Sequence, residues 1–327
     1  MKTLKELNEL AAATDFRPEA LEKIHKLLSI LERLDDNELS HGQWVLKGGT
    51  ALNLFHLEVP RLSVDIDINF LGAANVEELQ QAREVFERVL NAVCERSGCS
   101  IRRAPFEHAG GKFRLRYSTL LGGEQNLEVD VSYVARVPLW SVERRGCLLR
   151  ELASVKIPSL TLPELAAGKF TALLARSAPR DTFDALNLIE HQPSLFEQPE
   201  FRVSFVTQIA SSRADLRQPE LPASLNEKHV ETQLVPLLRV RAGAESRGAS
   251  ITEALQSKVR PVVEKMIRWS EDESRFLDRL LDDGELEPEH VADDLEIQER
   301  ISRQPMLLWK QKHVRQHKGL DPPGRPN

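Results

Sequence analysis

The most constraining feature of this sequence is the segment 44–70, in which a strand, a glycine turn, a helix and a second strand follow one another closely. Trp44-Val45-Leu46 predicts a short buried strand that ends at Lys47-Gly48-Gly49, and residues 50–57 regain the apolar spacing of a helix. From Leu62 to Phe70 apolar and polar side chains alternate, which predicts a half-buried strand. Together these elements predict a core that mixes strands and helices.

Two aspartates, Asp65 and Asp67, lie on the polar face of the second predicted strand. Because they are two residues apart, their carboxylates point the same way and crowd their oxygens into a small space. Such a concentration of negative charge is costly unless a cation neutralises it, and oxygen ligands suit Mg²⁺ or Mn²⁺. Asp65 and Asp67 are therefore candidate catalytic metal ligands, although a solvated pair on an exposed strand would give the same pattern.

The glycine turn upstream of the aspartates is a candidate phosphate site. Gly48 and Gly49 let the backbone approach a phosphate, and the helix that follows would direct its free N–H groups toward the anion. Thr50 can cap the helix or donate its hydroxyl. An ordinary strand-to-helix connection would look similar. In combination with the aspartate strand, however, the turn indicates a phosphate cradle next to a metal site.

A third carboxylate is available on the alternating segment 126–133, where Glu128 and Asp130 share the polar face. In two-metal nucleotidyl transfer, a third carboxylate holds the metal that activates the attacking hydroxyl. We assign this role to Asp130, with Glu128 as the alternative. The polar outer face of an edge strand remains an open interpretation of both residues.

The glycine turn and the aspartate strand together resemble the signature of a known family. Lys47-Gly48-Gly49-Thr50-Ala51-Leu52, followed by Arg61-Leu62-Ser63-Val64-Asp65-Ile66-Asp67, is similar to the motif of the AbiEii/AbiGii-type nucleotidyltransferase toxins. These belong to the polymerase-beta-like nucleotidyltransferase superfamily. The resemblance implies an α+β fold with a mixed sheet flanked by helices, followed by a mainly helical C-terminal region. It also implies that the glycine turn and the aspartates bind an NTP substrate and divalent metal ions, Mg²⁺ or Mn²⁺.

A second block, Lys169, Arg176, Arg180-Asp181 and Asp184, resembles a later motif of the same family. Lys169 and Arg176 are seven residues apart on a predicted helix, so both face one side and could clamp the nucleotide's phosphates. Lys169 is also a candidate catalytic residue. Arg180 and Asp184 complete the predicted nucleotide site, with Asp181 and Asp184 orienting Lys169, Arg176 or the substrate. A salt-bridged helix surface is the structural alternative.

Ser63 shares the face of the two aspartates, and it is a further candidate for nucleotide binding. The family resemblance implies that such a serine can also be a target of inactivating modification. A plain hydrogen-bonding serine would explain the same position.

Helical and strand-like patterns divide the chain near residue 158. We predict a nucleotidyltransferase core with an N-terminal helix at 1–158, a helical domain at 159–318 and a flexible tail at 319–327. The predicted strands after residue 70 are 100–103, 113–120 and 126–134, and the predicted helices include 16–34, 162–176 and 181–191.

Composition limits the cellular context. A net charge of −6 argues against a protein that coats nucleic acid non-specifically. No apolar run reaches membrane-spanning length, so we expect no membrane association and a cytoplasmic location. Near the C-terminus, Lys310, Lys312, Arg315 and Lys318, interleaved with Trp309, could form a local basic patch for RNA, and an exposed charged tail would explain the same residues.

The resemblance implies the toxin of a toxin–antitoxin or phage-defence system, with a cognate antitoxin protein as partner. Its expected reaction transfers a nucleoside monophosphate from NTP to an RNA acceptor, such as the 3′ end of a tRNA. Alternatives are NTP-dependent modification of a protein, by AMPylation or phosphorylation, and an NTP-binding interaction module without turnover. A metal-dependent nuclease would also use clustered carboxylates, but the glycine turn favours a triphosphate.

Overall fold

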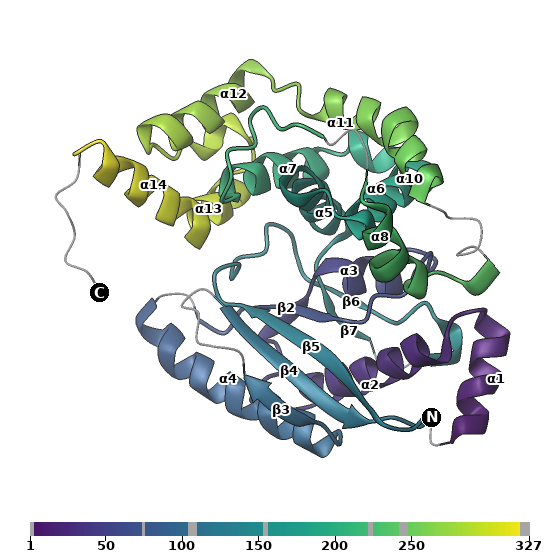
Figure 1. Ribbon diagram of the computed structural model, residues 1–327. Helices are drawn as coiled ribbons and strands as arrows, with labels where there is room; N and C mark the ends of the chain where they lie inside the picture. Colours follow the sequence, from purple (N-terminus) through teal and green to yellow (C-terminus); the bar gives the residue numbers. More distant parts are fainter. Residues whose placement is uncertain are drawn as a thin grey trace.

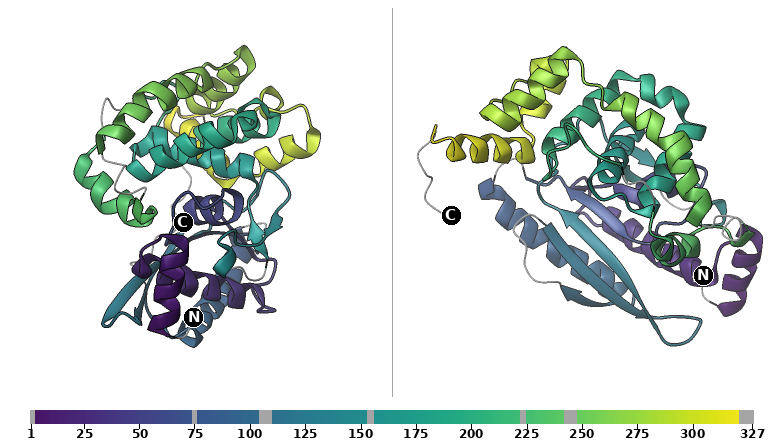
Figure 2. Two further views of the ribbon diagram at one scale, coloured as in Figure 1. Left: turned by 90° about the vertical axis from the view of Figure 1, so that its right-hand side faces the viewer. Right: turned by 45° about the horizontal axis from the view of Figure 1, so that its top comes forward.

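The computed structural model describes residues 3–73, 76–103, 110–152, 156–221, 225–241 and 248–320. A sheet with helices α2 and α4 against it forms one part of the molecule, and a group of helices from α5 onward forms the other (Figures 1 and 2). This architecture confirms the predicted α+β fold with a mainly helical C-terminal region. Within the described residues, no helix is both long and apolar enough to cross a membrane.

The strands of the described residues form one mixed sheet in the order β3-β4-β5-β2-β1-β7-β6. β2 runs parallel to β5, and β1 runs parallel to β7, whereas the other neighbours are antiparallel. The bounds are β1 Trp44–Leu46, β2 Ile66–Phe70, β3 Ser100–Arg103, β4 Gly110–Ser118, β5 Glu124–Ser132, β6 Glu143–Arg145 and β7 Ile157–Ser159.

The N-terminal helices cover the apolar side of this sheet. Thr3 and Glu6 form a capping box that starts α1 (Leu4–Thr14). Pro18 occupies the first turn of α2 (Pro18–Asp35), which confirms the predicted helix at 16–34. α4 (Val76–Arg96) packs beside α2 and β3. Hydrophobic burial by these helices leaves the polar side of β2 free to serve the site.

The segment before β2 is not a strand, which corrects the predicted start at Leu62. The backbone N–H of Leu62 donates to the carbonyl of Leu237, 2.8 Å away, in the helical part of the chain. The carbonyls of Ser63 and Asp65 accept from the Thr50 hydroxyl. Because these partners lie outside the sheet, residues 62–65 form a loop that leads the aspartates into the site.

Two short strands escaped the sequence prediction. β6 and β7 have three residues each, and Pro158 lies within β7, which pairs with β1 at Leu46↔Ser159. A strand of this length is too short to display a clear alternation. The predicted boundary between residues 158 and 159 falls inside β7, and one hydrophobic core continues through both predicted regions. The predicted domain division therefore stays a prediction, and residues 321–327 of the predicted tail lie outside the described residues.

The helical part wraps back onto the sheet part. The N–H of Val240 donates to the carbonyl of Asp15 at 2.7 Å, and the guanidinium of Arg239 lies over the ring of Phe16. The helices are α3 Gly48–Ala51, α5 Leu162–Arg176, α6 Pro179–His191, α7 Pro199–Ser211, α8 Glu227–His229, α10 Gly248–Ala254, α11 Arg260–Met266, α12 Glu271–Asp278, α13 Leu295–Ser302 and α14 Pro305–His317. Short 3-10 or π-helical turns are η1 Leu52–His56, η2 Arg150–Leu152, η3 Pro193–Glu197, η4 Val230–Leu234, η5 Val235–Leu237, η6 Leu255–Val259, η7 Arg279–Asp283 and η8 Pro288–His290.

Glu164 fastens the loop that follows β5 onto α5. Its carboxylate accepts from the backbone N–H groups of Leu139 and Trp140, at 3.1 and 3.3 Å. Burial raises the pKa of Glu164 from 4.5 to about 7, even though these two N–H groups and Arg300 favour the charged form. The folded protein therefore binds this proton more tightly than the unfolded chain does.

This linkage predicts a pH dependence of stability. Between pH 4.5 and about 7 the folded state holds more protons at Glu164, so the free energy of unfolding falls as the pH rises through this window. We expect Glu164→Gln to remove a fall of about 3 kcal/mol, measured as the difference between wild-type and variant urea-unfolding curves at each pH. A difference that does not change across the window would contradict the assignment.

Candidate active site

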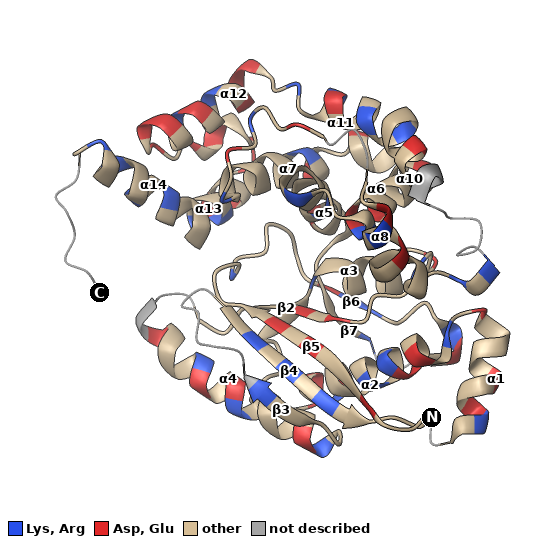
Figure 3. Cartoon of the chain, in the orientation of Figure 1, with Lys and Arg blue, Asp and Glu red and all other residues tan. Residues whose placement is uncertain are grey.

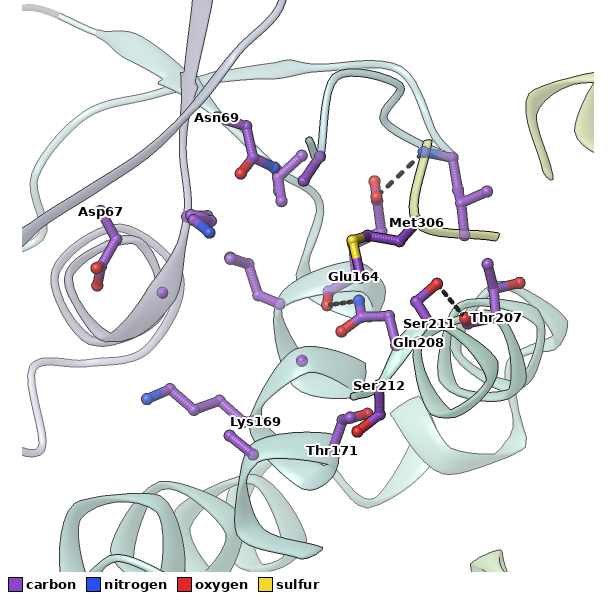
Figure 4. Close-up of a pocket in the computed structure, with 18 of the residues that line it drawn as sticks. Asp67, Asn69, Glu164, Lys169, Thr171, Thr207, Gln208, Ser211, Ser212 and Met306 are labelled. Atoms are coloured by element: carbon purple, nitrogen blue, oxygen red, sulfur yellow. Dashed lines mark hydrogen bonds between the residues drawn. The ribbon is translucent and has the colours of Figure 1, made fainter. Parts of the chain in front are cut away.

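A cleft of about 470 Å³ lies between the β1–α3 turn and helices α5 and α7 (Figure 4). Its lining includes six of the predicted site residues: Lys47, Gly48, Gly49, Asp67, Lys169 and Arg176. The other predicted site residues do not line the cleft but lie next to residues that do: Thr50, Ser63, Asp65, Asp130, Arg180 and Asp184. Residues more than a hundred positions apart in sequence therefore meet at one site.

The two glycines are required by close side-chain contacts. Gly48 has a φ of +71°, and a Cβ atom at this position would lie 2.3 Å from the carboxylate of Asp67. A Cβ atom at Gly49 would lie 2.8 Å from the Ser63 hydroxyl and 3.0 Å from the Arg61 guanidinium. The turn thus brings its backbone directly against the aspartate strand and the loop that precedes it.

Thr50 and Ser63 are buried in this contact region. The Thr50 hydroxyl donates to the carbonyl of Ser63 at 3.2 Å and to that of Asp65 at 2.5 Å. Thr50 is fully buried, and Ser63 is nearly so. In this arrangement Thr50 positions the loop, and the parts of both residues in nucleotide binding stay predictions.

Asp67 is the acidic residue at the centre of the site. It pairs in register with Asp130 on the parallel strand β5, so the two side chains lie on the same face of the sheet. Burial raises the pKa of Asp67, and the carboxylates of Asp65 and Asp130 raise it further, while Lys47 and Lys169 oppose them. The charged form of Asp67 would therefore be stabilised by an added cation.

The surroundings of Asp130 and Glu128 distinguish the two candidates for the third carboxylate. Glu128 is bound by Lys112 at 2.8 Å and Arg114 at 3.3 Å, and these contacts lower its pKa. Asp130 lies one step closer to the site, directly beside Asp67. This geometry favours Asp130 as the third carboxylate.

The three predicted metal ligands are not gathered into one cluster. Asp65 is held by Arg180 at 3.3 Å. In the part of the chain that the structure describes, no three Asp, Glu, His or Cys side chains form a group that could hold a metal ion. Asp67 and Asp130 are nevertheless register partners on β2 and β5, and their carboxylate oxygens are the donor type that Mg²⁺ and Mn²⁺ prefer.

A buried ion-pair network connects the aspartate loop to α5 and α6. Arg61 donates two hydrogen bonds to Asp184, both at 2.7 Å, and Lys169 binds the same carboxylate at 2.9 Å. The exposed fractions of the Arg61 and Asp184 side chains are 1% and 0%. Burial alone would raise the pKa of Asp184, but Arg61 and Lys169 together hold it well below its ordinary value.

The network continues from Lys169 to the surface. Asp181 accepts from Lys169 at 3.2 Å and from Arg176 at 2.7 Å. The paired carboxylate raises the pKa of Arg176, although burial opposes this effect. Asp181 thus restrains both Lys169 and Arg176 at the cleft, and Asp184 restrains Lys169; the parts of these residues in nucleotide binding stay predictions.

The sequence of this chain matches a known protein family. The family model of the nucleotidyl transferase AbiEii toxin, of type IV toxin–antitoxin systems, matches residues 29–286. The chain belongs to the AbiEii family of nucleotidyltransferase toxins. This membership confirms the family resemblance of the glycine turn and the aspartate strand. No curated protein sequence matches this AbiEii-family chain.

One solved structure supports the fold of this AbiEii-family protein, and a second shows weaker similarity. MenT4, a nucleotidyltransferase toxin from Mycobacterium tuberculosis H37Rv, has a TM-score of 0.55 at 17% identity, covering 92% of this chain and 98% of MenT4. JHP933 from Helicobacter pylori has a TM-score of 0.43 at 17% identity, covering 93% of this chain and 99% of JHP933. At this identity the likeness to MenT4 shows a shared fold.

Sequence reasoning missed two residues of the AbiEii-family site. Arg61 stands among apolar residues of the motif, and this setting is a signal that its charge would be buried and need a partner. Asn53 donates to the carbonyl of Gly49 at 3.0 Å and to Asp184 at 3.1 Å. No sequence pattern distinguishes Asn53 from other helix residues.

The close approach of Gly48 to Asp67 can be tested with a matched pair of alanine variants. Gly42 has a φ of +72°, almost the same as Gly48, but a Cβ atom there would meet nothing within 4 Å. We expect Gly42→Ala to cost about 1 kcal/mol of stability, the strain of a left-handed residue, and to leave NTP affinity unchanged. Gly48→Ala carries the same strain and displaces Asp67, so NTP affinity measured by calorimetry should fall at least about tenfold. Equal affinities in the two variants would contradict this account.

The buried network predicts a large stability effect. Asp184→Asn keeps the shape of the side chain but leaves Arg61 and Lys169 without their shared countercharge, so the free energy of unfolding should fall by about 3 kcal/mol or more. The exposed pair Lys5–Glu9, at 3.8 Å, offers the control, because Glu9→Ala should change stability by less than about 0.5 kcal/mol. Urea unfolding measures both. Similar small effects would show that the network does not stabilise the fold.

Proposed function

We propose that this AbiEii-family toxin transfers a nucleoside monophosphate from an NTP to an RNA acceptor, releasing pyrophosphate, with a divalent cation. The observation that carries the proposal is the meeting of the glycine turn, Asp67 and the Lys169–Arg176 pair at one cleft. A triphosphate requires positive charge on several sides, and the cleft offers Lys47, Lys169 and Arg176. Such a reaction needs no covalent enzyme intermediate, because positioning and charge neutralisation supply most of the rate.

Each side chain has a defined task in this proposal. Lys169 would contact the phosphates from a fixed position, since Asp181 and Asp184 restrict its ammonium group. Arg176 is more exposed and would close over the phosphates from the rim. Arg180 releases Asp65 when a cation or substrate competes for that carboxylate.

Asp67 and Asp130, joined by Asp65, would hold the divalent cation. Their chemistry fits the ion, because the half-buried carboxylate of Asp67 already experiences repulsion from Asp65 and Asp130 that a cation would remove. When bound, the ion would polarise the reacting phosphate and favour the ionised form of the attacking hydroxyl.

Exposed cations near the site support an RNA acceptor. Arg102, Lys112, Arg114 and Arg116 follow β3 and β4 beside the acidic strands β5 and β2 (Figure 3). Glu128 already pairs with Lys112 and Arg114, and Glu124 pairs with Arg116, so these carboxylates balance part of the positive charge. A phosphate backbone would bind the remaining positive charge of this surface.

The predicted basic patch at the C-terminus is weaker than its sequence suggested. Lys310 is only 8% exposed, and burial lowers its pKa. Lys318 is paired with Asp283 at 3.0 Å. The patch was overestimated because α14 (Pro305–His317) directs Lys310 into the protein, so the sheet surface is the better acceptor site.

A tRNA 3′ end as the acceptor, a cognate antitoxin as the partner and a cytoplasmic location remain part of the proposal. Modification of a protein by the same site is the alternative reaction. A non-catalytic NTP-binding module is the alternative from another functional class. Both alternatives use the same triphosphate site. The first modifies a protein, and the second binds the NTP without transferring any part of it.

The proposal predicts the behaviour of three carboxylate variants. Purified protein is incubated with Mg²⁺, total bacterial RNA and each α-labelled NTP, and RNA is then separated from protein. We expect label in RNA with the wild type, and a loss on the order of a hundredfold or more with Asp67→Asn and Asp130→Asn. Glu128→Gln is the matched control, because its carboxylate is occupied by Lys112 and Arg114, and it should retain activity within a few-fold.

Other outcomes identify the alternatives. Label in protein would establish protein modification, and label transferred only from γ-labelled NTP would identify phosphorylation. Tight NTP binding without transfer to either polymer would favour the interaction module. Cleavage of RNA without any label would indicate a nuclease.

A further inference from the structure

The cleft has two chemically different ends. Its charged end carries Lys47, Asp67 and Lys169. The opposite end is lined by neutral side chains of α7 and α14, among them Gln208 and Met306, with Glu164 held by backbone N–H groups beside them (Figure 4). An NTP has the same asymmetry, with a highly charged triphosphate and an uncharged base.

Two residues that line this cleft, Asn69 and Thr207, each have a buried side-chain oxygen without a hydrogen bond among the described residues. Asn69 is 5% exposed and Thr207 is 2% exposed, and both line the cleft. Among the described residues, neither the side-chain oxygen of Asn69 nor the hydroxyl of Thr207 has a hydrogen bond. An unsatisfied buried polar group costs about 1–3 kcal/mol, so its presence in two walls of one cleft points to a ligand that completes it.

The side-chain amide of Gln208, on α7, packs against the backbone of α5. Its amide N–H donates to the carbonyl of Glu164 at 3.0 Å. A Cβ atom at Gly168, in the middle of α5, would lie 3.1 Å from the amide oxygen of Gln208. A glycine within a helix costs about 1 kcal/mol relative to alanine, and here it leaves room for this amide. The fixed amide oxygen is available at the cleft as an acceptor.

We propose that the neutral end of the cleft binds the nucleobase of the donor NTP, with Gln208 and Thr207 of α7 on one wall and Asn69 of β2 on the facing wall reading its hydrogen-bonding edge. This inference rests on the proposed function. Amide side chains match the donor and acceptor pattern of a base edge, and the apolar side chains of Leu165 and Met306 provide walls for its flat faces. The cleft is continuous, so a single nucleotide spans both ends.

A nucleobase could also come from the end of the RNA acceptor. The donor is favoured because the neutral end opens into the same cleft as the glycine turn and Lys169, where the triphosphate is proposed to bind. Binding experiments with NTP in the absence of RNA distinguish the two sources.

The test measures the dissociation constants of ATP, GTP, CTP, UTP and tripolyphosphate by calorimetry, with Mg²⁺ and without RNA. We expect the wild type to prefer one base at least about tenfold over the weakest. Gln208→Leu should reduce this preference about tenfold and leave tripolyphosphate binding unchanged. Thr207→Val is nearly isosteric and should weaken the preference without loss of folding.

Ser211 also lines the cleft, but its hydroxyl already donates to the carbonyl of Thr207 at 2.8 Å, so Ser211→Ala is the matched control on α7 for a lining hydroxyl that is occupied within the protein. It should leave the base preference unchanged. The inference is overturned if all four NTPs bind the wild type equally, or if Gln208→Leu and Thr207→Val keep the wild-type preference while tripolyphosphate still binds. If neither NTP nor tripolyphosphate binds the wild type, the proposed function fails as well. A preference that appears only when RNA is present assigns the pocket to the acceptor and overturns the donor assignment.

Discussion

The buried carboxylate of Asp184 is the constraint on which the site depends. It lies between Arg61, in the loop before the aspartate strand, and Lys169, on the helix that borders the cleft. Unpaired, each of these charges would be strongly destabilising in the interior, so the loop and the helix are held in one relative arrangement. Asn53 adds a link from the same carboxylate to the glycine turn. The positions of Lys169 and of the glycine turn at the cleft follow from this network.

Packing around the cleft fixes the positions of the charged side chains that line it. The glycines allow the turn to touch Asp67 and Ser63, and Thr50 fixes the loop before β2 at the carbonyls of Ser63 and Asp65. Asp67 becomes partly isolated from water beside two other carboxylates, which makes its charge responsive to a cation. Lys169 and Arg176 remain directed at the cleft because Asp181 restrains both. Polarity then decreases along the cleft toward α7.

Local patterns in the sequence were sufficient for the elements of the site. The buried strand at Trp44–Leu46, its glycine turn and the alternation of β5 all follow from short-range periodicity. Long-range features were not accessible in this way. The partners Arg61 and Asp184 are 123 residues apart, and the wall formed by α7 comes from a segment without a recognisable motif. The predicted strand at 62–65 was wrong because the backbone there forms its hydrogen bonds outside the sheet. The burial of Lys310 was missed because the sequence does not show which face of its helix packs against the protein.

The central claim is that Asp67 and Asp130 hold a divalent cation beside a triphosphate on the glycine turn. The most direct measurement is the anomalous scattering of Mn²⁺ in crystals grown with a non-hydrolysable NTP. The account predicts a Mn²⁺ peak in contact with both carboxylates, with triphosphate density between the turn and Lys169. A bound triphosphate with Mn²⁺ located away from Asp67 and Asp130, or nucleotide bound elsewhere on the molecule, would contradict it.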